Sequence, residues 1–311
     1  MILLCRQYRN QLSQIMSTRH QPVMLSECVQ ALHAERGGVF VDATLGGGGH
    51  AEKILEANPE NIVIGIDRDA QAIERTKKRL AEYGDRVIYV HAPFSSIESI
   101  VAEHAGGKVD GILADLGVSS DQIEDRDRGF SFMQDGPLDM RMDSTQQKAS
   151  AALLLAEASE DEIENWLREY GEERFARKIA NAIVVARRTV PLLRTLQLAD
   201  LVERNTRRSK GKHHPATRTF QALRIAVNRE LDEVKMLLEV APSLLNEGGR
   251  LGVISFHSLE DGLVKNAIRN EARSDGFINV FKKGILPSAH EVHRNPRSRS
   301  ARLRVLSHEL D

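Results

Sequence analysis

The sequence predicts an α/β fold in which a parallel sheet carries helices on both faces and is interrupted by an inserted helical domain. From residue 39 to residue 115, short apolar runs alternate strictly with helical patterns, as is typical of parallel sheets. From about 125 to 215 no strand is evident, although apolar residues recur at three- and four-residue spacing. Strand-like runs return only after this stretch, so we expect two separate pieces of chain to build the sheet.

The individual elements follow from these patterns in chain order. Strands are expected at 39–42, 62–67, 87–91, 109–115, 249–255 and 301–306. Helices are expected at 51–57, 70–83 and 97–105, and in the insertion at 149–157, 160–169 and 172–188. The chain then divides into a first part of the sheet domain at 21–124, an all-helical insertion at 125–215, and a second part at 216–311.

Residues 1–20 are expected to be an extension of the folded domain. The first 26 residues contain Arg6, Arg9 and Arg19 but no acidic residue. This composition is typical of a disordered or spurious extension, with Met16 as the true start, and also of an organellar leader. The sequence leaves these two alternatives open, and with them a bacterial or an organellar origin.

A glycine-rich loop directly after the first strand indicates a ligand site. Asp42 ends the apolar run, and Gly46 to Gly49 then lead to His50. Four glycines let the main chain approach a ligand closely and adopt positive φ, at an entropic cost that an ordinary turn does not require. The spacing differs from the G-x-G-x-x-G fingerprint of dinucleotide sites, which argues against a nicotinamide-dependent oxidoreductase.

Two carboxylates indicate which ligand this loop binds. Asp67 ends the next strand, roughly 20 residues beyond the glycines, where such folds place the acid that binds ribose hydroxyls. Asp42, just ahead of the loop, suits a ligand with a positive charge. S-adenosylmethionine has a ribose and carries both an ammonium and a sulfonium group. We therefore expect it to be the cofactor of a Rossmann-like sheet.

A third carboxylate, Asp115, ends the fourth strand. Open α/β sheets bind ligands at the carboxyl ends of their strands, so Asp115 should share one edge with Asp67 and the glycine loop. An aspartate in this position also serves as a helix cap or turn former, and Gly117 and Ser119 could be turn residues. The shared edge favours a functional role for Asp115.

Together these segments resemble the 16S ribosomal RNA (cytosine-N4)-methyltransferase family, and the resemblance extends from about residue 20 to residue 305. It is carried by long strings of unusual composition: Val41-Asp-Ala-Thr-Leu-Gly-Gly-Gly-Gly-His50, Gly65-Ile-Asp-Arg-Asp69, Asp115-Leu-Gly-Val-Ser-Ser120, Arg128-Gly-Phe-Ser-Phe-Met133, Asp135-Gly-Pro-Leu-Asp-Met-Arg-Met142 and Asn295-Pro-Arg-Ser-Arg-Ser300. The family has a Rossmann-like, S-adenosylmethionine-dependent methyltransferase sheet with a helical insertion, in agreement with the architecture expected above.

The resemblance implies an activity and a set of site residues. The activity is methylation of the exocyclic N4 amine of a cytidine at the decoding site of 16S rRNA, nucleotide 1402 in standard ribosomal numbering. Asp115 is the implied catalytic residue. The implied cofactor-binding residues are Gly48, Gly49, His50, Asp67, Phe94, Asp115 and Gln122.

The residue that stacks on the target base remains open. Many amino-methyltransferases resemble one another in placing Pro-Pro and an aromatic residue directly after the acid, but Leu116, Gly117 and Val118 follow Asp115 here. Phe130, Phe132 and His257 are the candidates. His257 could also be a general base, because its unperturbed pKa lies near neutrality, or a hydrogen-bonded loop residue.

Charge and composition indicate the partners. The formal net charge is only −1, yet basic residues gather between Arg187 and Arg224 and between Lys282 and Arg304. Such patches bind phosphates even in a neutral protein, so we expect contact with 16S rRNA within the small ribosomal subunit. The sequence leaves open whether the substrate is naked rRNA or the assembled subunit. The sequence leaves open whether the chain acts as a monomer or a homodimer.

Other features restrict the class of protein. The 311 residues include two cysteines, so we expect neither a disulfide framework nor a cysteine-based metal site, and the scattered histidines suggest no metal. Without a membrane-spanning segment, a cytoplasmic location is expected. A non-catalytic, cofactor-binding ribosome-assembly factor is the alternative function, which the intact glycine loop, Asp67 and Asp115 argue against.

Overall fold

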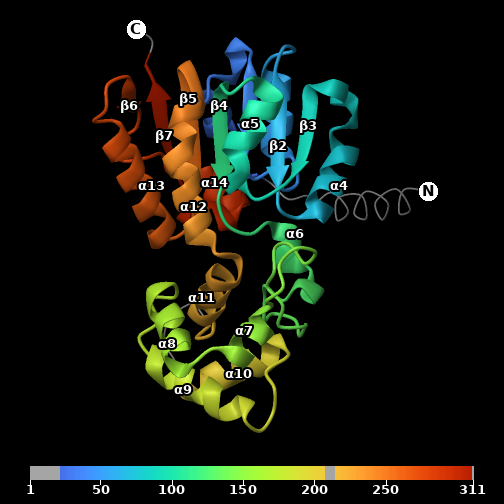
Figure 1. Ribbon diagram of the computed structural model, residues 1–311, viewed down its shortest axis with the longest axis vertical. Coiled ribbons are helices and arrows are strands. Elements are labelled where there is room, and N and C mark those ends of the chain that lie inside the picture. The colour runs from blue at the N-terminus through green and yellow to red at the C-terminus, as the bar shows by residue number, and fades with distance from the viewer. Residues whose placement is uncertain (1–21, 207–213, 310–311) are drawn as a thin grey trace, which may run out of the picture.

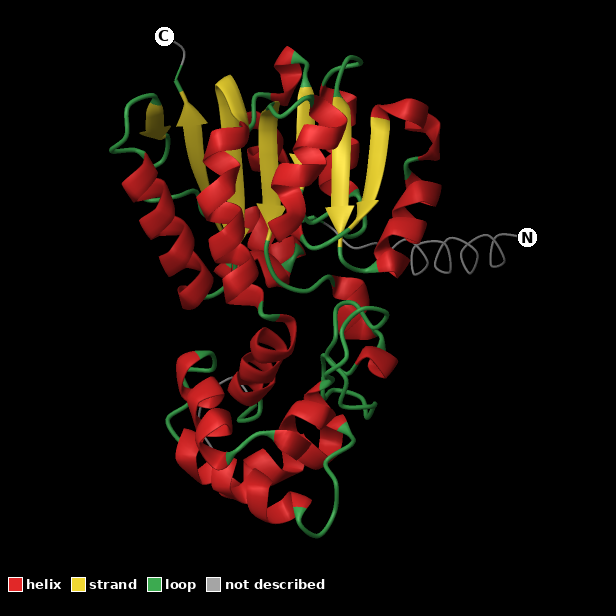
Figure 2. Cartoon of the chain, viewed as in Figure 1, coloured by secondary structure: helices red, strands yellow, loops and turns green. Residues whose placement is uncertain are grey.

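The computed structural model describes residues 22–206 and 214–309 (Figure 1). The expected extension at 1–20 lies outside these residues, as does the basic stretch 207–213. The described chain forms a sheet layer flanked by helices, with a separate helical body beyond one edge of the sheet (Figures 1 and 2). Among the described helices, none combines the length and apolar composition needed to span a bilayer.

The sheet contains seven strands in the order β3-β2-β1-β4-β5-β7-β6. Their bounds are β1 Val39–Asp42, β2 Ile62–Asp67, β3 Val87–His91, β4 Val109–Asp115, β5 Leu245–Ser255, β6 Phe277–Asn279 and β7 Arg302–His308. The first five strands are parallel, whereas β7 is antiparallel to both β5 and β6. The predicted α/β class is confirmed. The strand expected at 301–306 is β7, which is antiparallel rather than parallel, and the short β6 is a strand that was not expected.

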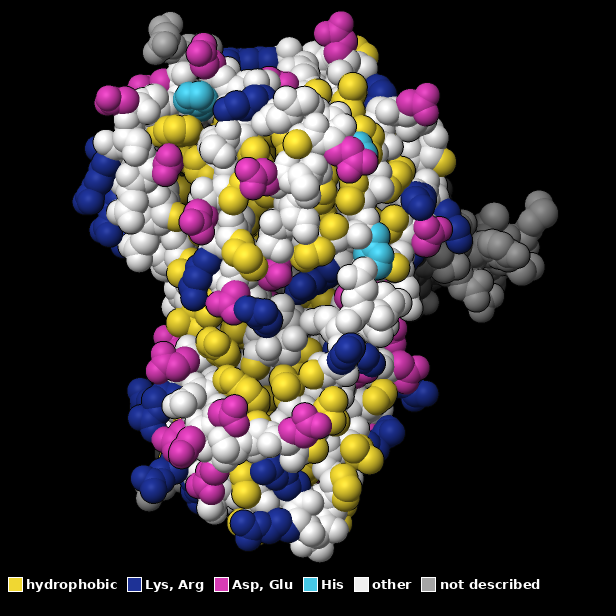
Figure 3. Space-filling model, viewed as in Figure 1, with side chains coloured by type: hydrophobic (Ala, Val, Ile, Leu, Met, Phe, Trp, Pro, Cys, Tyr) yellow, Lys and Arg dark blue, Asp and Glu magenta, His cyan; other side chains and the backbone are white. Residues whose placement is uncertain are grey.

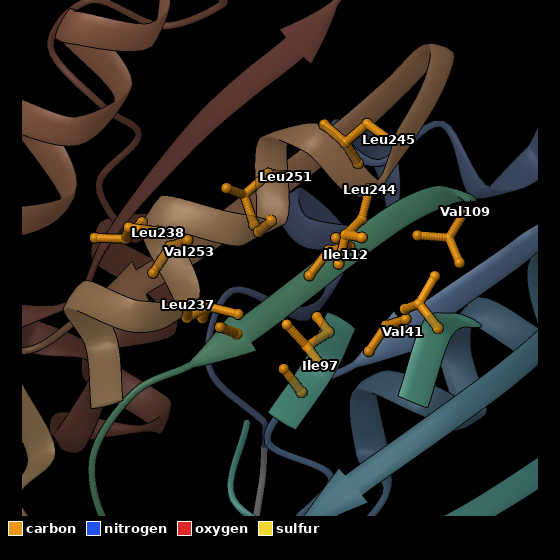
Figure 4. Packing of buried hydrophobic residues seen from close by; sticks show 14 of the residues in the cluster. Val41, Ile97, Val109, Ile112, Leu237, Leu238, Leu244, Leu245, Leu251 and Val253 are labelled. Atoms are coloured by element: carbon orange, nitrogen blue, oxygen red, sulfur yellow. The ribbon is translucent and has the colours of Figure 1, made fainter. Parts of the chain in front are cut away.

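Two layers of helices cover the sheet. One contains α5 Ile97–Ala105, α12 Glu230–Val240 and α13 Ser258–Glu271, and the other contains α2 Leu25–Ala31, α3 Gly49–Ala57 and α4 Ala70–Arg79. Successive side chains of a strand point to opposite faces, so Val41 packs in the first layer and Phe40 in the second. Figure 4 shows the first layer, where Val41 and Ile112 of the sheet pack with Ile97 and Leu237 of the helices.

The helical body lies between β4 and β5 in the sequence. It contains α7 Ala151–Glu157, α8 Glu160–Glu169, α9 Ala176–Arg187, α10 Thr195–Asn205 and α11 Thr217–Asn228, and α6 Ser120–Glu124 precedes it. Its core is separate from those of the sheet layers. The expected boundary at 215 excludes α11, but Phe220, Leu223 and Val227 of α11 are part of this helical core. Their three- and four-residue spacing places them on one face of α11, so the body extends to Asn228.

Asn228 connects α11 to the loop that leads into the helical body. Its side chain is 1% exposed; Nδ2 donates to the carbonyl oxygen of Met140 at 2.8 Å, and Oδ1 accepts from the N–H of Met142 at 2.8 Å. Between these two bonds the buried Met140 adopts φ +62°, a conformation that costs a non-glycine residue roughly 1–2 kcal/mol. The two hydrogen bonds of Asn228 therefore hold a strained turn in place.

We predict that Asn228→Ala lowers the free energy of unfolding by about 2–4 kcal/mol, because it leaves two buried backbone groups without partners and releases the turn at Met140. Urea unfolding followed by circular dichroism would measure this. The matched control is Asn270→Ala on the exposed face of α13, which should change stability by less than about 0.5 kcal/mol. Equal effects of the two variants would contradict the assignment.

Candidate active site

The loops that follow the parallel strands enclose a cavity of about 460 Å³. Because β1 to β5 are parallel, their carboxyl ends meet at one edge of the sheet, the place where open α/β sheets bind ligands. The lining comes from every one of these loops and also from α14 Ala289–Arg294 and the following turn. Of the predicted site residues, the cavity is lined by Gly49, His50, Asp67, Phe94, Asp115 and Gln122.

The glycine loop supports this cavity in two ways. Gly46, Gly47 and Gly49 line it, whereas Gly48 does not. Gly48 instead precedes α3 with φ +75°, and a Cβ on it would lie 2.5 Å from Cγ2 of Thr76 in α4. A Cβ on Gly49 would lie 2.1 Å from Cγ of Pro22. Side chains are thus excluded from both positions by close packing, and the loop stays tight against α4.

Asp67 links the glycine loop to the second strand. Its Oδ2 accepts from the N–H of Gly46 at 2.7 Å, and its Oδ1 accepts from the N–H of Asp69 at 2.8 Å. Burial raises the pKa of Asp67 to about 6, although these two N–H groups favour the charged form. Each carboxylate oxygen retains a second lone pair, so Asp67 could also accept hydrogen bonds from ligand hydroxyls.

Asp115 has a free oxygen in a buried position. Its backbone N–H donates to Oγ1 of Thr44 at 2.6 Å, which joins the ends of β4 and β1. Its side-chain Oδ1 is buried and has no hydrogen-bond partner within the described chain. Burial, followed by the charges of Asp42 and Glu260, raises the pKa of Asp115 well above its ordinary value. A cationic ligand would relieve this cost.

His50 approaches Asp115 from the glycine loop. Its Nε2 lies 3.0 Å from the carbonyl oxygen of Val23, and its Nδ1 lies 3.9 Å from Oδ2 of Asp115. Because a carbonyl oxygen only accepts, Nε2 carries the proton in this contact. His50 is 5% exposed, so its ring is a buried part of the cavity lining beside Asp115.

Phe94 and Gln122 occupy different parts of the wall. Phe94 begins the short 3₁₀ turn after β3 and offers an aromatic face to the cavity. In Gln122, Nε2 donates to Oδ2 of Asp69 at 3.1 Å and Oε1 accepts from the N–H of Ser119 at 3.0 Å. The latter contact belongs to a capping box that begins α6. Both the nitrogen and the oxygen of the Gln122 side-chain amide are therefore hydrogen-bonded to protein groups.

Asp42 lies beneath the loop and outside the cavity lining. It is 1% exposed, and its Oδ1 accepts from the N–H of Thr44 at 3.2 Å, while Oδ2 is buried without a partner in the described chain. Burial raises its pKa to about 7. Asp42 can therefore affect a cationic ligand in the cavity only by its electrostatic field, without direct contact.

The donor set suits S-adenosylmethionine. Asp67 could bind ribose hydroxyls, the aromatic face of Phe94 could pack on adenine, and the unpartnered oxygen of Asp115 could accept from an ammonium group. Burial raises the pKa of the three carboxyl groups at this edge, Asp42, Asp67 and Asp115, and a cationic ligand would favour their charged forms. The residues present therefore fit the chemistry of the expected cofactor.

The three candidates for base stacking lie elsewhere. Phe130 and Phe132 pack against the helical core, where the ring of Phe132 lies 4.7 Å from that of Phe220. His257 caps α13, with Nδ1 accepting from the N–H of Glu260 at 3.4 Å, so the interpretation as a hydrogen-bonded loop histidine is the better one. None of the three lines the cavity.

Several lining residues were not predicted from the sequence. They are Thr44, Met142, Phe256, Arg294 and Arg297, together with residues that flank them. The place of Phe256 at the cavity could have been predicted from the sequence, because this residue directly follows a predicted strand. Arg297 belongs to the quoted string Asn295–Ser300, and its Nη2 donates to Oε1 of Glu124 at 3.0 Å, which connects the turn after α14 with α6.

We predict that Asp42→Asn makes stability less dependent on pH. The folded-state pKa of Asp42, about 7, lies above the unfolded value of about 4, so its stabilising contribution is present below pH 4 and is lost as the pH rises through 7. Between pH 5 and 8, the wild type should lose on the order of 3 kcal/mol relative to Asp42→Asn. Parallel stability curves for the two proteins, from urea titrations, would contradict this.

Comparison with known proteins gives the family. A model of the MraW methylase family matches residues 17–309. "Ribosomal RNA small subunit methyltransferase H" of Synechococcus elongatus is 47% identical over 300 residues, covering 96% of this chain and 97% of that protein. The protein of the same name from a Cyanothece species is 50% identical over 293 residues, covering 94% of this chain and 95% of that one.

A solved rRNA methylase from Streptococcus thermophilus shares 11% identity and a TM-score of 0.40, covering 91% of this chain and 95% of that one, a likeness too distant to inform the site. The family match, in contrast, spans the sheet, the helical body and every loop of the cavity, and the two relatives are similar over almost their whole length. The chain therefore belongs to the MraW methylase family.

Proposed function

We propose that this methyltransferase transfers the methyl group of S-adenosylmethionine to the exocyclic N4 amine of the decoding-site cytidine of 16S rRNA, within the small ribosomal subunit. The observation that carries the proposal is the unpartnered, buried oxygen of Asp115, between the cofactor loops and the β5 side of the cavity. The names of the relatives, which specify small-subunit rRNA, support the substrate class. A cytoplasmic location is part of the same proposal.

The residues of β1 to β3 bind and orient the cofactor. S-adenosylmethionine supplies an electrophilic methyl group on a positively charged sulfur. Asp67, Phe94 and the glycine loop line the cavity; Asp67 would hold the ribose, Phe94 would pack on the adenine, and the glycine loop would leave room for the methionine portion. Burial disfavours the charged form of Asp115, and a neighbouring cation would favour it.

Asp115 also activates the acceptor amine. The N4 lone pair of cytosine is delocalised into the ring, so the amine is a poor nucleophile. A carboxylate oxygen that accepts from an N4 hydrogen localises this lone pair and stabilises the positive charge that develops on N4. As the bond from N4 to the methyl carbon would form, the bond from that carbon to sulfur would break, S-adenosylhomocysteine would leave, and the methylated N4 would lose one proton to water. Holding the cofactor and the base next to each other removes part of the entropic cost of bringing them together. This can lower the activation free energy by up to roughly 7–11 kcal/mol in favourable cases.

Arginines near the cavity and on the helical body support RNA binding. Arg294 and Arg297 line the cavity, and Arg188 and Arg204 are exposed on the helical body. Figure 3 shows Lys and Arg over the helical part of one face, intermixed with Asp and Glu. Two arginines of the predicted basic segments are internal, however: Arg224 pairs with Glu230, and Arg304, 3% exposed, pairs with Asp261. The target base must leave its stack to reach Asp115.

We predict that Asp115→Asn lowers kcat by about 100-fold or more, because the amide keeps the size of the side chain but loses its charge. Asp115→Ala should abolish turnover while the far-ultraviolet circular dichroism stays unchanged. Asp275→Asn, an exposed acid outside the cavity, is the matched control and should retain kcat within twofold. Full activity of Asp115→Asn would remove the residue from the mechanism.

The acceptor atom is tested by nucleoside mass spectrometry. Undermethylated small subunits are incubated with the protein and S-adenosylmethionine, and RNA fragments are mapped for new methyl groups. We expect N4-methylcytidine at the decoding-site cytidine. A methyl group at another nucleotide or atom would overturn the proposed target, and the absence of any product on subunits that a known enzyme of this type methylates would overturn the proposed function.

A further inference from the structure

Two phenylalanines line the cavity, and they lie at different ends of the strand order. Phe94 follows β3, and Phe256 follows β5. In the order β3-β2-β1-β4-β5, the acid at the end of β4 lies between them. The cofactor loops occupy the β1 to β3 side, so Phe256 is on the side left for the acceptor.

Phe256 is close to the end of β4 by pairing of the strands. Asp115 is in register with Ile254, and the N–H of Leu116 donates to the carbonyl oxygen of Ile254 at 3.0 Å. Neighbouring strands lie roughly 5 Å apart, so a planar base whose amine reaches Asp115 comes within reach of the Phe256 ring. A Cβ on Gly117 would lie 4.0 Å from Cδ2 of Phe256. With glycine there, no side chain covers the Phe256 ring from this position, while the ring also packs, partly buried, against the core of the second helix layer.

The backbone of Phe256 is hydrogen-bonded to the buried carboxyl group of Glu260. Its N–H donates to Oε2 of Glu260 at 2.8 Å, and Glu260 is 1% exposed. Oε1 of Glu260 lies 3.0 Å from Nε2 of His257, and this contact helps to lower the pKa of Glu260, although burial opposes it. The ring is therefore presented from a fixed strand end, as a preorganised contact requires.

We propose that Phe256 is the aromatic platform on which the acceptor cytosine stacks while Asp115 contacts its N4 amine. A base removed from its helix loses its stacking partners, and an aromatic ring replaces them by roughly 1–3 kcal/mol per base. The segment after Asp115 offers no aromatic residue, and Phe256 supplies one from the adjacent strand. This assignment rests on the proposed function, because it concerns the base-binding half of that site.

The test compares Phe256→Ala, Phe256→Leu and Phe256→Tyr with the wild type on undermethylated small subunits. Phe256→Ala should lower kcat/KM by about 10- to 100-fold, the fold-change that corresponds to the stacking contribution. Phe256→Tyr should restore at least half of the activity, and Phe256→Leu should not, because it restores packing without a π-face. The Kd for S-adenosylmethionine, from calorimetry, should stay within twofold in all three.

Two control variants separate this role from others. Phe94→Ala should instead raise the Kd for S-adenosylmethionine, because Phe94 is on the cofactor side. Phe281→Ala, a partly exposed phenylalanine outside the cavity, should leave both quantities unchanged. Full activity of Phe256→Leu, or of Phe256→Ala, would overturn the proposal. A loss of cofactor affinity in Phe256→Ala as large as that in Phe94→Ala would also overturn it.

A readout independent of turnover distinguishes this proposal from the proposed function. The wild type is saturated with S-adenosylhomocysteine and irradiated with a decoding-site RNA fragment that carries 5-bromocytidine at the target position. A crosslink mapped by mass spectrometry to Phe256 is the expected result. Crosslinks confined to other residues would overturn the platform even if methylation occurs. An inactive wild type would overturn the proposed function instead.

Discussion

The structure depends on one constraint, the convergence of three carboxyl groups at a buried edge of the sheet. Parallel pairing brings the ends of β1, β2 and β4 together, and each of these strands ends in an aspartate. Backbone N–H groups from the neighbouring loops stabilise Asp42 and Asp67. Asp115 retains an oxygen with no such partner. Burial disfavours the charged forms of these carboxyl groups, and a cationic ligand would favour them, so the cost of this arrangement and the proposed affinity for the cofactor have a common origin.

The helical body is attached to this edge by side chains next to the same acids. Arg128 donates to Oδ2 of Asp69 at 2.9 Å and to the carbonyl oxygen of Met142 at 2.8 Å. Arg68 donates to the carbonyl oxygen of Asn228, at the end of α11, at 3.0 Å. Residues directly after Asp67 thus contact both ends of the inserted segment, which links the cavity to the helical body by direct hydrogen bonds.

The sequence predicts the parts of the fold and site that depend on local patterns. Alternation of apolar runs predicts β1 to β5, and the acids at two strand ends, Asp67 and Asp115, line the cavity as their positions in the sequence indicate. Long-range packing could not be predicted in this way. Phe220 and Leu223 look like residues of the second sheet part, yet they complete the helical core. Phe256 comes near the end of β4 only through the β4–β5 pairing, and the tight packing of Gly48 against Thr76 depends on α4.

The insertion between β4 and β5 has a consequence for how the chain folds. Asp115 and Ile254 pair across about 140 residues, and closing so long a loop carries a large entropic cost and slows folding. The helices between them pack mostly on one another, so they can form first and bring the two strand ends together. On this route the β4–β5 pair, which joins the two sides of the cavity, forms after the inserted helices. An active site whose halves meet last is exposed to misfolding for longer than either half alone.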